Sequence, residues 1–245
     1  MKSIIKKTMT VGGISLILGG QLISPTTINA LDGVDVVIRI GEFQNKSGKR
    51  LVGIDENFDI DCPIRYDKET GYHIQEYDLN KKLAKKIYNY LHLQGVNVIL
   101  QDTKGKSEDL GSAGRKAKNY NPKIYLSCHH NSYNSNSSGY LFVTNNDTQS
   151  KKYAKQISNA MTSNPILLEA RENQINYGNI SELSVEPADV NMIFEAGFAL
   201  SNKEEAKKCA SDEYMDFIAR TMGNELIQIL NEINNSKGEM KLWQI

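Results

Sequence analysis

The sequence predicts a single α/β domain, built on a mainly parallel, twisted sheet with helices on both faces. Short apolar, β-branched segments alternate along the chain with amphipathic segments of ten or more residues, which is the pattern of strands joined by helical crossovers. The chain has 245 residues, of which 40% are hydrophobic and 24% charged. This composition excludes collagen-like, coiled-coil and disordered chains.

The first thirty residues have the features of an export signal. A head with three lysines precedes an apolar run from Met9 to Ile23, and a polar stretch then ends at Ala30. The apolar run is too short to span a bilayer comfortably. We therefore expect residues 1–30 to be a cleaved signal peptide, with no stable membrane insertion afterwards. The alternative is an uncleaved N-terminal anchor.

The expected elements follow in order. Val34–Ile40 is apolar and β-branched and predicts a buried first strand before Gly41. From Tyr77 to Gln94, leucine and isoleucine recur every fourth residue with lysines opposite, which predicts an amphipathic helix. We expect further strands over 96–100, 124–128, 140–144 and 189–194, and further helices over 109–119, 149–163, 203–209 and 212–233.

The remaining segments lack a sustained period. Residues 44–72 predict loops with at most a short hairpin, and this length favours a functional role. We expect a flexible loop rich in Asn and Ser over 131–138, an irregular stretch from 164 to Pro187, and a short tail over 234–245.

Charge and cysteine content narrow the class of protein. Without the signal segment the chain has 26 basic and 29 acidic residues, so nothing supplies the basic stripe that nucleic acid requires. The three cysteines, Cys62, Cys128 and Cys209, are too few and too widely spaced for a disulfide framework or a metal knuckle. An exported chain without a disulfide network fits a bacterial cell-envelope enzyme, so we expect a monomer that is secreted and stays at the cell envelope or wall.

Polar residues gather where the predicted strands end. Glu42 follows the first strand, His129 and His130 follow the third, Glu195 follows the last, and Glu76 opens the first long helix. Because sites in open parallel sheets lie beyond the carboxyl ends of the strands, these groups are candidates for a divalent metal site, with zinc the first choice.

Each of these residues also has a structural interpretation. Glu76 can serve as a helix-end dipole partner, and His129 as a hydrogen-bonded core histidine. Strand alternation allows only one of His129 and His130 to face a common site. A carboxylate directly after an apolar strand, as at Glu195, is partly buried and needs a partner.

These residues and their order resemble the zinc-dependent N-acetylmuramoyl-L-alanine amidases of bacterial wall hydrolases, spore-cortex enzymes and clostridial phage lysins. The resemblance runs from about Val36 to Leu230. Its elements are Gln75-Glu76-Tyr77 before the first helix, the helix–Gly–strand unit from Leu91 to Leu100, Arg115 to Asn119, the Ser127-x-His129-x-Asn131 signature, Gly139 before a strand, and Phe194-Glu195-x-Gly197-Phe198 with Ser201-Asn202.

The resemblance implies a function and a set of site residues. It implies that Glu76 and His129 bind Zn²⁺, that Glu195 is catalytic, and that residues 31–233 form an amidase-like catalytic domain. The reaction would be hydrolysis of the amide between N-acetylmuramic acid and L-alanine in peptidoglycan. Arg115 and Asn131 are the expected substrate contacts, although a structural ion pair is the alternative for Arg115.

One position departs from the family pattern. The family's first ligand is a His after the first strand, in a Gly-His context, where this sequence has Gly41-Glu42. Glu42 is then a carboxylate ligand that leaves the metal less electrophilic. There are two alternatives to Glu42 as the third ligand. One is His73, three residues before Glu76, and the other is a degenerate metal site. The competing function is an impaired amidase-like domain that binds peptidoglycan or regulates a true hydrolase. A hydrolase using Cys128 is weakly supported, because Cys128 lies within a strand.

Overall fold

The structure, a computed structural model, describes residues 33–41, 48–102, 108–162, 170–177 and 180–236. Its main sheet has six strands in the order β5-β1-β6-β9-β7-β8. All neighbours run parallel except β7 and β9, which are antiparallel. The strands are β1 (Val36–Ile40), β5 (Val98–Gln101), β6 (Ile124–His129), β7 (Tyr140–Thr144), β8 (Ala170–Tyr177) and β9 (Val190–Glu195).

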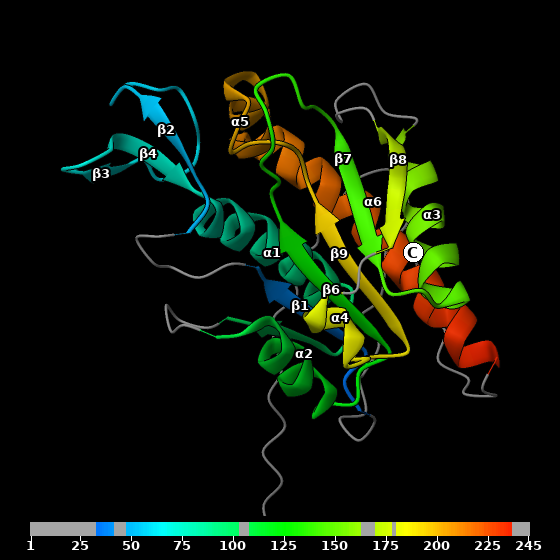
Figure 1. The fold of residues 1–245 in the computed structure, drawn as a ribbon. Helices are drawn as coiled ribbons and strands as arrows, with labels where there is room; N and C mark the ends of the chain where they lie inside the picture. The colour runs from blue at the N-terminus through cyan, green and yellow to red at the C-terminus, as the bar shows by residue number, and fades with distance from the viewer. Residues whose placement is uncertain (1–32, 42–47, 103–107, 163–169, 178–179, 237–245) are drawn as a thin grey trace, which may run out of the picture. The chain divides into compact units, whose positions relative to one another are not determined.

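Helices cover both faces of this sheet (Figure 1). On one face the large core packs against α1 (Glu76–Leu93), α3 (Thr148–Thr162) and α6 (Asp212–Ser236). On the other face, α2 (Leu110–Lys118) and α4 (Ser181–Ser184) cover a smaller apolar cluster. A short helix, α5 (Lys203–Ala210), precedes α6. The predicted α/β class with a mainly parallel, helix-covered sheet is confirmed.

A second, three-stranded antiparallel sheet lies before α1. It has the order β2-β4-β3, with β2 (Arg50–Ile54), β3 (Arg65–Asp67) and β4 (Gly71–Gln75). β4 runs directly into α1, and Arg65 holds β3 to that helix through two hydrogen bonds to Asp78 of 2.6 and 2.5 Å. The short hairpin allowed for in the expected loops over 44–72 is present as β3 and β4, whereas β2 was not expected.

The other predicted elements agree with the structure to within a few residues, and two elements were missed. β8 and α4 lie in the stretch expected to be irregular. β8 reads ARENQINY and lacks the alternation of apolar residues that predicts a strand. The last helix continues to Ser236, three residues past the expected end of the domain. The predicted signal segment lies outside the described residues.

In the described part of the chain, no helix is long and apolar enough to cross a membrane.

Candidate active site

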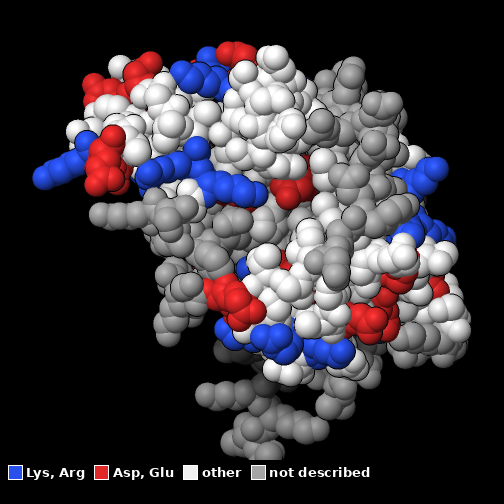
Figure 2. All heavy atoms as spheres, in the orientation of Figure 1, with Lys and Arg blue, Asp and Glu red and all other residues white. Residues whose placement is uncertain are grey.

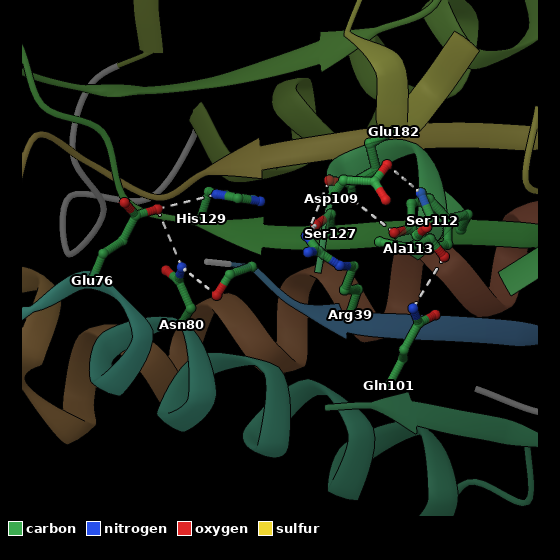
Figure 3. Close-up of polar contacts among 12 residues, drawn as sticks. Arg39, Glu76, Asn80, Gln101, Asp109, Ser112, Ala113, Ser127, His129 and Glu182 are labelled. Carbon is green, nitrogen blue, oxygen red and sulfur yellow. Dashed lines mark hydrogen bonds and ion pairs between the residues drawn. The ribbon is translucent and has the colours of Figure 1, made fainter. Parts of the chain in front are cut away.

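Three elements bring polar residues to the carboxyl edge of the sheet. His129 is the last residue of β6, Glu195 is the last residue of β9, and Glu76 is the first residue of α1. Figure 3 shows Glu76 reaching from the start of α1 to His129 on its strand. The expected convergence of Glu76 and His129 is therefore present.

Glu76 and His129 form a buried pair. Nδ1 of His129 lies 3.0 Å from Oε1 of Glu76, and the Glu76 residue is only 1% exposed. Burial by itself raises the pKa of Glu76, but the hydrogen bond and the charge of His129 outweigh it and lower that pKa. Burial alone lowers the pKa of His129, but Glu76 outweighs it and raises that pKa. Each partner therefore favours the charged form of the other.

Asn80 and His130 support this pair, and neither was predicted to do so. Asn80 is fully buried, one turn after Glu76, and its Nδ2 donates to Oε1 of Glu76 at 3.2 Å and to the carbonyl of Gly41 at 3.2 Å. Its Oδ1 therefore accepts from Nδ1 of His130 at 2.8 Å, while the backbone N–H of His130 donates to Oε1 of Glu76 at 3.3 Å. The available signal was a polar residue in the apolar stripe of α1.

His130 is a neutral hydrogen-bonding residue. It is fully buried, and burial lowers its pKa to about 4. With a proton on Nδ1 for Asn80, its Nε2 is unprotonated. Strand alternation was expected to allow only one of the two histidines to face the site, but both contact the start of α1, because β6 ends at His129.

Gly41 lies directly against His129. Its N–H donates to the carbonyl of Cys128 at 3.0 Å. A Cβ at this position would lie 2.3 Å from Nε2 of His129, so no side chain fits without displacing the ring. The glycine thus allows the end of β1 to approach the histidine closely.

Glu195 lies beside His129 across the sheet. The two residues are register partners of the parallel strands β6 and β9. Register partners on neighbouring strands point to the same face about 4.8 Å apart. The charge of Glu195 also contributes to the raised pKa of His129, after the larger effects of burial and Glu76. Glu195 is half-buried, and its Oε2 is a buried atom.

The other predicted site residues have different positions. Glu42 lies outside the described residues. His73 is buried in β4, and its Nδ1 lies 3.4 Å from the carbonyl oxygen of Gly71. The Arg115 side chain is 60% exposed on α2, and its described partners are Ser112 at 3.0 Å and Asp109 at 3.7 Å, not the Glu76–His129 pair.

Asn131 connects the ends of two strands. Its N–H donates to the carbonyl of Gly197 at 2.7 Å, and its carbonyl accepts from the N–H of Leu200 at 3.3 Å. Its side-chain oxygen accepts from the N–H of Ser132 at 2.7 Å. The loop after His129 is thereby fixed to the turn after Glu195.

The described donors fit part of a zinc shell. The 3.0 Å between Nδ1 of His129 and Oε1 of Glu76 is close to the roughly 3.3 Å between two ligands of a tetrahedral zinc ion at bond lengths of about 2.0–2.2 Å. Oε2 of Glu76 and Nε2 of His129 are buried polar atoms without a hydrogen-bond partner. Within the described residues, no group of three His, Cys, Asp or Glu side chains is arranged for a metal.

A buried ion pair lies on the same face of the sheet as His129 (Figure 3). Arg39 of β1 donates through Nη1 to Glu182 of α4 at 3.0 Å and to Ser127 of β6 at 3.3 Å. Tyr125 donates to the other oxygen of Glu182 at 2.6 Å. All four residues are fully buried. The network fixes α4 to the sheet, and Ser127 lies two residues before His129 on the same side of β6.

Charged side chains lie on the surface near the carboxyl edge of the sheet. In the space-filling view, basic side chains lie beside a recessed acidic one, near the point where the arrowheads of β6 and β9 end in Figure 1 (Figure 2). A basic side chain, Lys49, acts on Glu76 by its charge, after burial and His129.

The fold is that of amidase catalytic domains. The catalytic domain of CwlV, an N-acetylmuramoyl-L-alanine amidase from Bacillus (Paenibacillus) polymyxa var. colistinus, matches with a TM-score of 0.64 and 22% identity, over 81% of this chain and 98% of that one. The N-acetylmuramoyl-L-alanine amidase of Clostridium difficile 630 matches with a TM-score of 0.61 and 22% identity, over 81% and 97%. The CwlD amidase of Clostridioides difficile, solved in complex with the GerS lipoprotein, gives 0.60 and 20%, over 81% and 99%.

The sequence places the chain in the same group. A family profile described as N-acetylmuramoyl-L-alanine amidase matches residues 65–228, which is more than half of the chain. The chain belongs to the N-acetylmuramoyl-L-alanine amidase family. No match was found among curated proteins.

Proposed function

We propose that this protein is a secreted peptidoglycan hydrolase that cleaves the amide between the lactyl group of N-acetylmuramic acid and the L-alanine of the stem peptide. Family membership over residues 65–228 supports the substrate and the bond. One observation carries the proposal for this chain: a buried carboxylate–imidazole pair, Glu76 and His129, lies at the carboxyl edge of the sheet, with Glu195 in register beside it.

Glu76 and His129 would hold a zinc ion, with Glu42 as third ligand. Gly41 supports the choice of Glu42, since it lies against the His129 ring and receives a hydrogen bond from Asn80. When bound, zinc supplies a Lewis acid for the amide carbonyl and lowers the pKa of a water molecule. Two carboxylates around one imidazole reduce that effect, because they neutralise the ion more fully than two imidazoles and one carboxylate would.

Glu195 would move the proton. Its side chain is half-buried and faces the same side of the sheet as His129. From there it takes a proton from the attacking water and returns it to the leaving amine, as general base and then general acid. Asn80 and His130 keep the Glu76 carboxylate in place during these steps. Arg115 and Asn131 remain the proposed substrate contacts.

The test uses Glu195→Gln, which removes the proton carrier and leaves the metal donors intact. We expect release of new N-terminal L-alanine from peptidoglycan to fall by about two to four orders of magnitude, with zinc content near one per chain unchanged. Glu204→Gln is the matched control, because this glutamate is 86% exposed on α5, and its rate should equal that of the wild-type protein.

The metal assignment is tested separately. Glu76→Gln and His129→Ala should each lower zinc stoichiometry. If both variants keep one zinc per chain, the ligand assignment is wrong. If the wild-type protein binds peptidoglycan but releases no L-alanine with any divalent ion, the chain is an amidase-like binding protein and the catalytic proposal fails.

A further inference from the structure

An exposed aromatic ring lies on the loop that leaves the candidate site. Tyr133 is 77% exposed and follows His129 by four residues, which span at most about 14 Å of extended chain. A single exposed aromatic residue is common on protein surfaces and needs no functional explanation. What distinguishes Tyr133 is the way its backbone is held.

Hydrogen bonds fix the start of this loop to the turn that follows β9. Asn131 and Gly197 are joined by a 2.7 Å bond, and the N–H of Tyr133 donates to Oγ of Ser201 at 3.1 Å. The turn that receives these bonds begins two residues after Glu195. The backbone of Tyr133 is therefore fixed relative to both sides of the candidate site.

A buried carboxylate fixes the far end of the loop to the same turn. Glu205 of α5 is 4% exposed. One of its oxygens accepts from the N–H of Gly139 at 2.7 Å, and the other accepts from the N–H of Phe198 at 2.5 Å. In between, Asn202 donates to the carbonyl of Ser137 at 3.3 Å. The loop expected to be flexible is thus attached at both ends.

The chemistry around the ring is polar and uncharged. The neighbouring loop residues are Ser132, Asn134, Ser135 and Asn136, and all of them are exposed. Hydroxyl and amide groups around an aromatic ring match a sugar, which has an apolar ring face and a rim of hydroxyl and acetamido groups. An anionic or fully apolar ligand would find no matching charge or groove in this loop.

We propose that Tyr133 forms a carbohydrate subsite, on which a sugar ring of the glycan strand next to the cleaved muramic acid residue stacks. This inference rests on the proposed function, because it takes the substrate of that site to be a glycan with peptide stems. The held backbone fixes the place from which the ring projects, so little backbone entropy is lost when the sugar docks.

The test compares a long and a short substrate. One is a glycan strand with several disaccharide units, and the other is a single N-acetylmuramic acid residue carrying the same peptide. Tyr133→Ala should raise the KM for the strand about 3- to 10-fold, the range of one aromatic contact, and leave kcat and all constants for the short substrate unchanged. Tyr133→Trp should restore the strand KM.

Two further variants complete the design. Ser201→Ala removes the bond to the Tyr133 N–H and should give a smaller rise in the strand KM. Tyr120→Ala is the matched control: this tyrosine is 46% exposed at the end of α2, and β6, which spans six residues or about 20 Å, separates it from the site. It should change neither KM.

The outcomes separate the two proposals. If the wild-type protein neither cleaves nor binds the strand, the proposed function fails. If it cleaves the strand, but Tyr133→Ala has no effect or affects both substrates equally, the function stands and the subsite is wrong. Binding can also be measured without turnover, by comparing the Kd of the strand for Glu195→Gln with its Kd for the double variant Glu195→Gln/Tyr133→Ala. The same rise is expected in this Kd as in the KM, and an unchanged Kd contradicts the subsite.

Discussion

Asn80 joins three buried polar groups, so its replacement by leucine tests the architecture of the site. Asn80→Leu keeps the branched shape and the number of heavy atoms of the side chain. It removes the partners of the Gly41 carbonyl and of Nδ1 of His130, and one of the bonds to Glu76. The Glu76 carboxylate and the His130 ring should lose their fixed orientation, while the packing of α1 against the sheet is largely retained.

The magnitude follows from the number of groups left without partners. Each unsatisfied buried group costs about 1–3 kcal/mol, and two groups lose their partner outright while the Glu76 carboxylate keeps its other bonds. The added apolar surface of leucine returns about 1–2 kcal/mol. We expect the free energy of unfolding to fall by about 3 kcal/mol, which lowers Tm by about 6–12 °C in a domain of this size.

Thermal unfolding measures the loss of stability, and a zinc titration measures a second expected effect, the loss of metal affinity. Because Asn80 orients a proposed ligand, Asn80→Leu should also weaken zinc binding about 10- to 100-fold. Asn224→Leu is the control, since Asn224 of α6 is a partly buried helical asparagine that accepts one bond, from Tyr90 at 2.5 Å. A Tm loss for Asn80→Leu no larger than that of the control would refute the reasoning.

Three other predictions concern Gly41, the third metal ligand and Arg115. Gly41→Ala would place a methyl 2.3 Å from the histidine that ends β6 and should cost about 1–3 kcal/mol in an unfolding titration, whereas Gly33→Ala, with nothing within 4 Å, should be neutral. If Glu42 is the third ligand, Glu42→His should keep zinc and raise amidase activity at neutral pH, and Glu42→Ala should weaken zinc binding. If His73→Ala loses zinc and Glu42→Ala does not, the third ligand is His73 of β4. Arg115→Ala should raise KM for the stem peptide with Tm unchanged, because its ion pair is exposed, and an unchanged KM would remove it from the substrate contacts.

The sequence predicted the fold well where periodicity was strong. The apolar strands β1, β6 and β9 and the amphipathic helix α1 have clear periods. β8 and β2 were missed, and β3 and β4 were allowed for at most as a short hairpin, because their sequences lack a sustained alternation of apolar and polar residues. Tertiary pairing, not local pattern, defines them.

Within the candidate site, the sequence predicted the ends of the elements but not the contacts that support them. Glu76, His129 and Glu195 were found because they end or begin strongly patterned elements. Asn80 and the supporting contacts of His130 were missed, because the partners are 39 to 54 residues away in the sequence. Hydrogen bonds at that separation leave no periodic signal in a single sequence.

The buried Arg39–Glu182 pair has a consequence for the order of folding. It joins residues 143 positions apart, and both charges are costly to bury until they meet. The pair forms only when β1, β6 and α4 are all in place, and contacts at such separation are slow to form. An incompletely folded chain that lacks α4 carries an unpaired arginine beneath His129. We therefore expect zinc binding and hydrolysis to appear together in the last phase of refolding, after most helical structure has already returned.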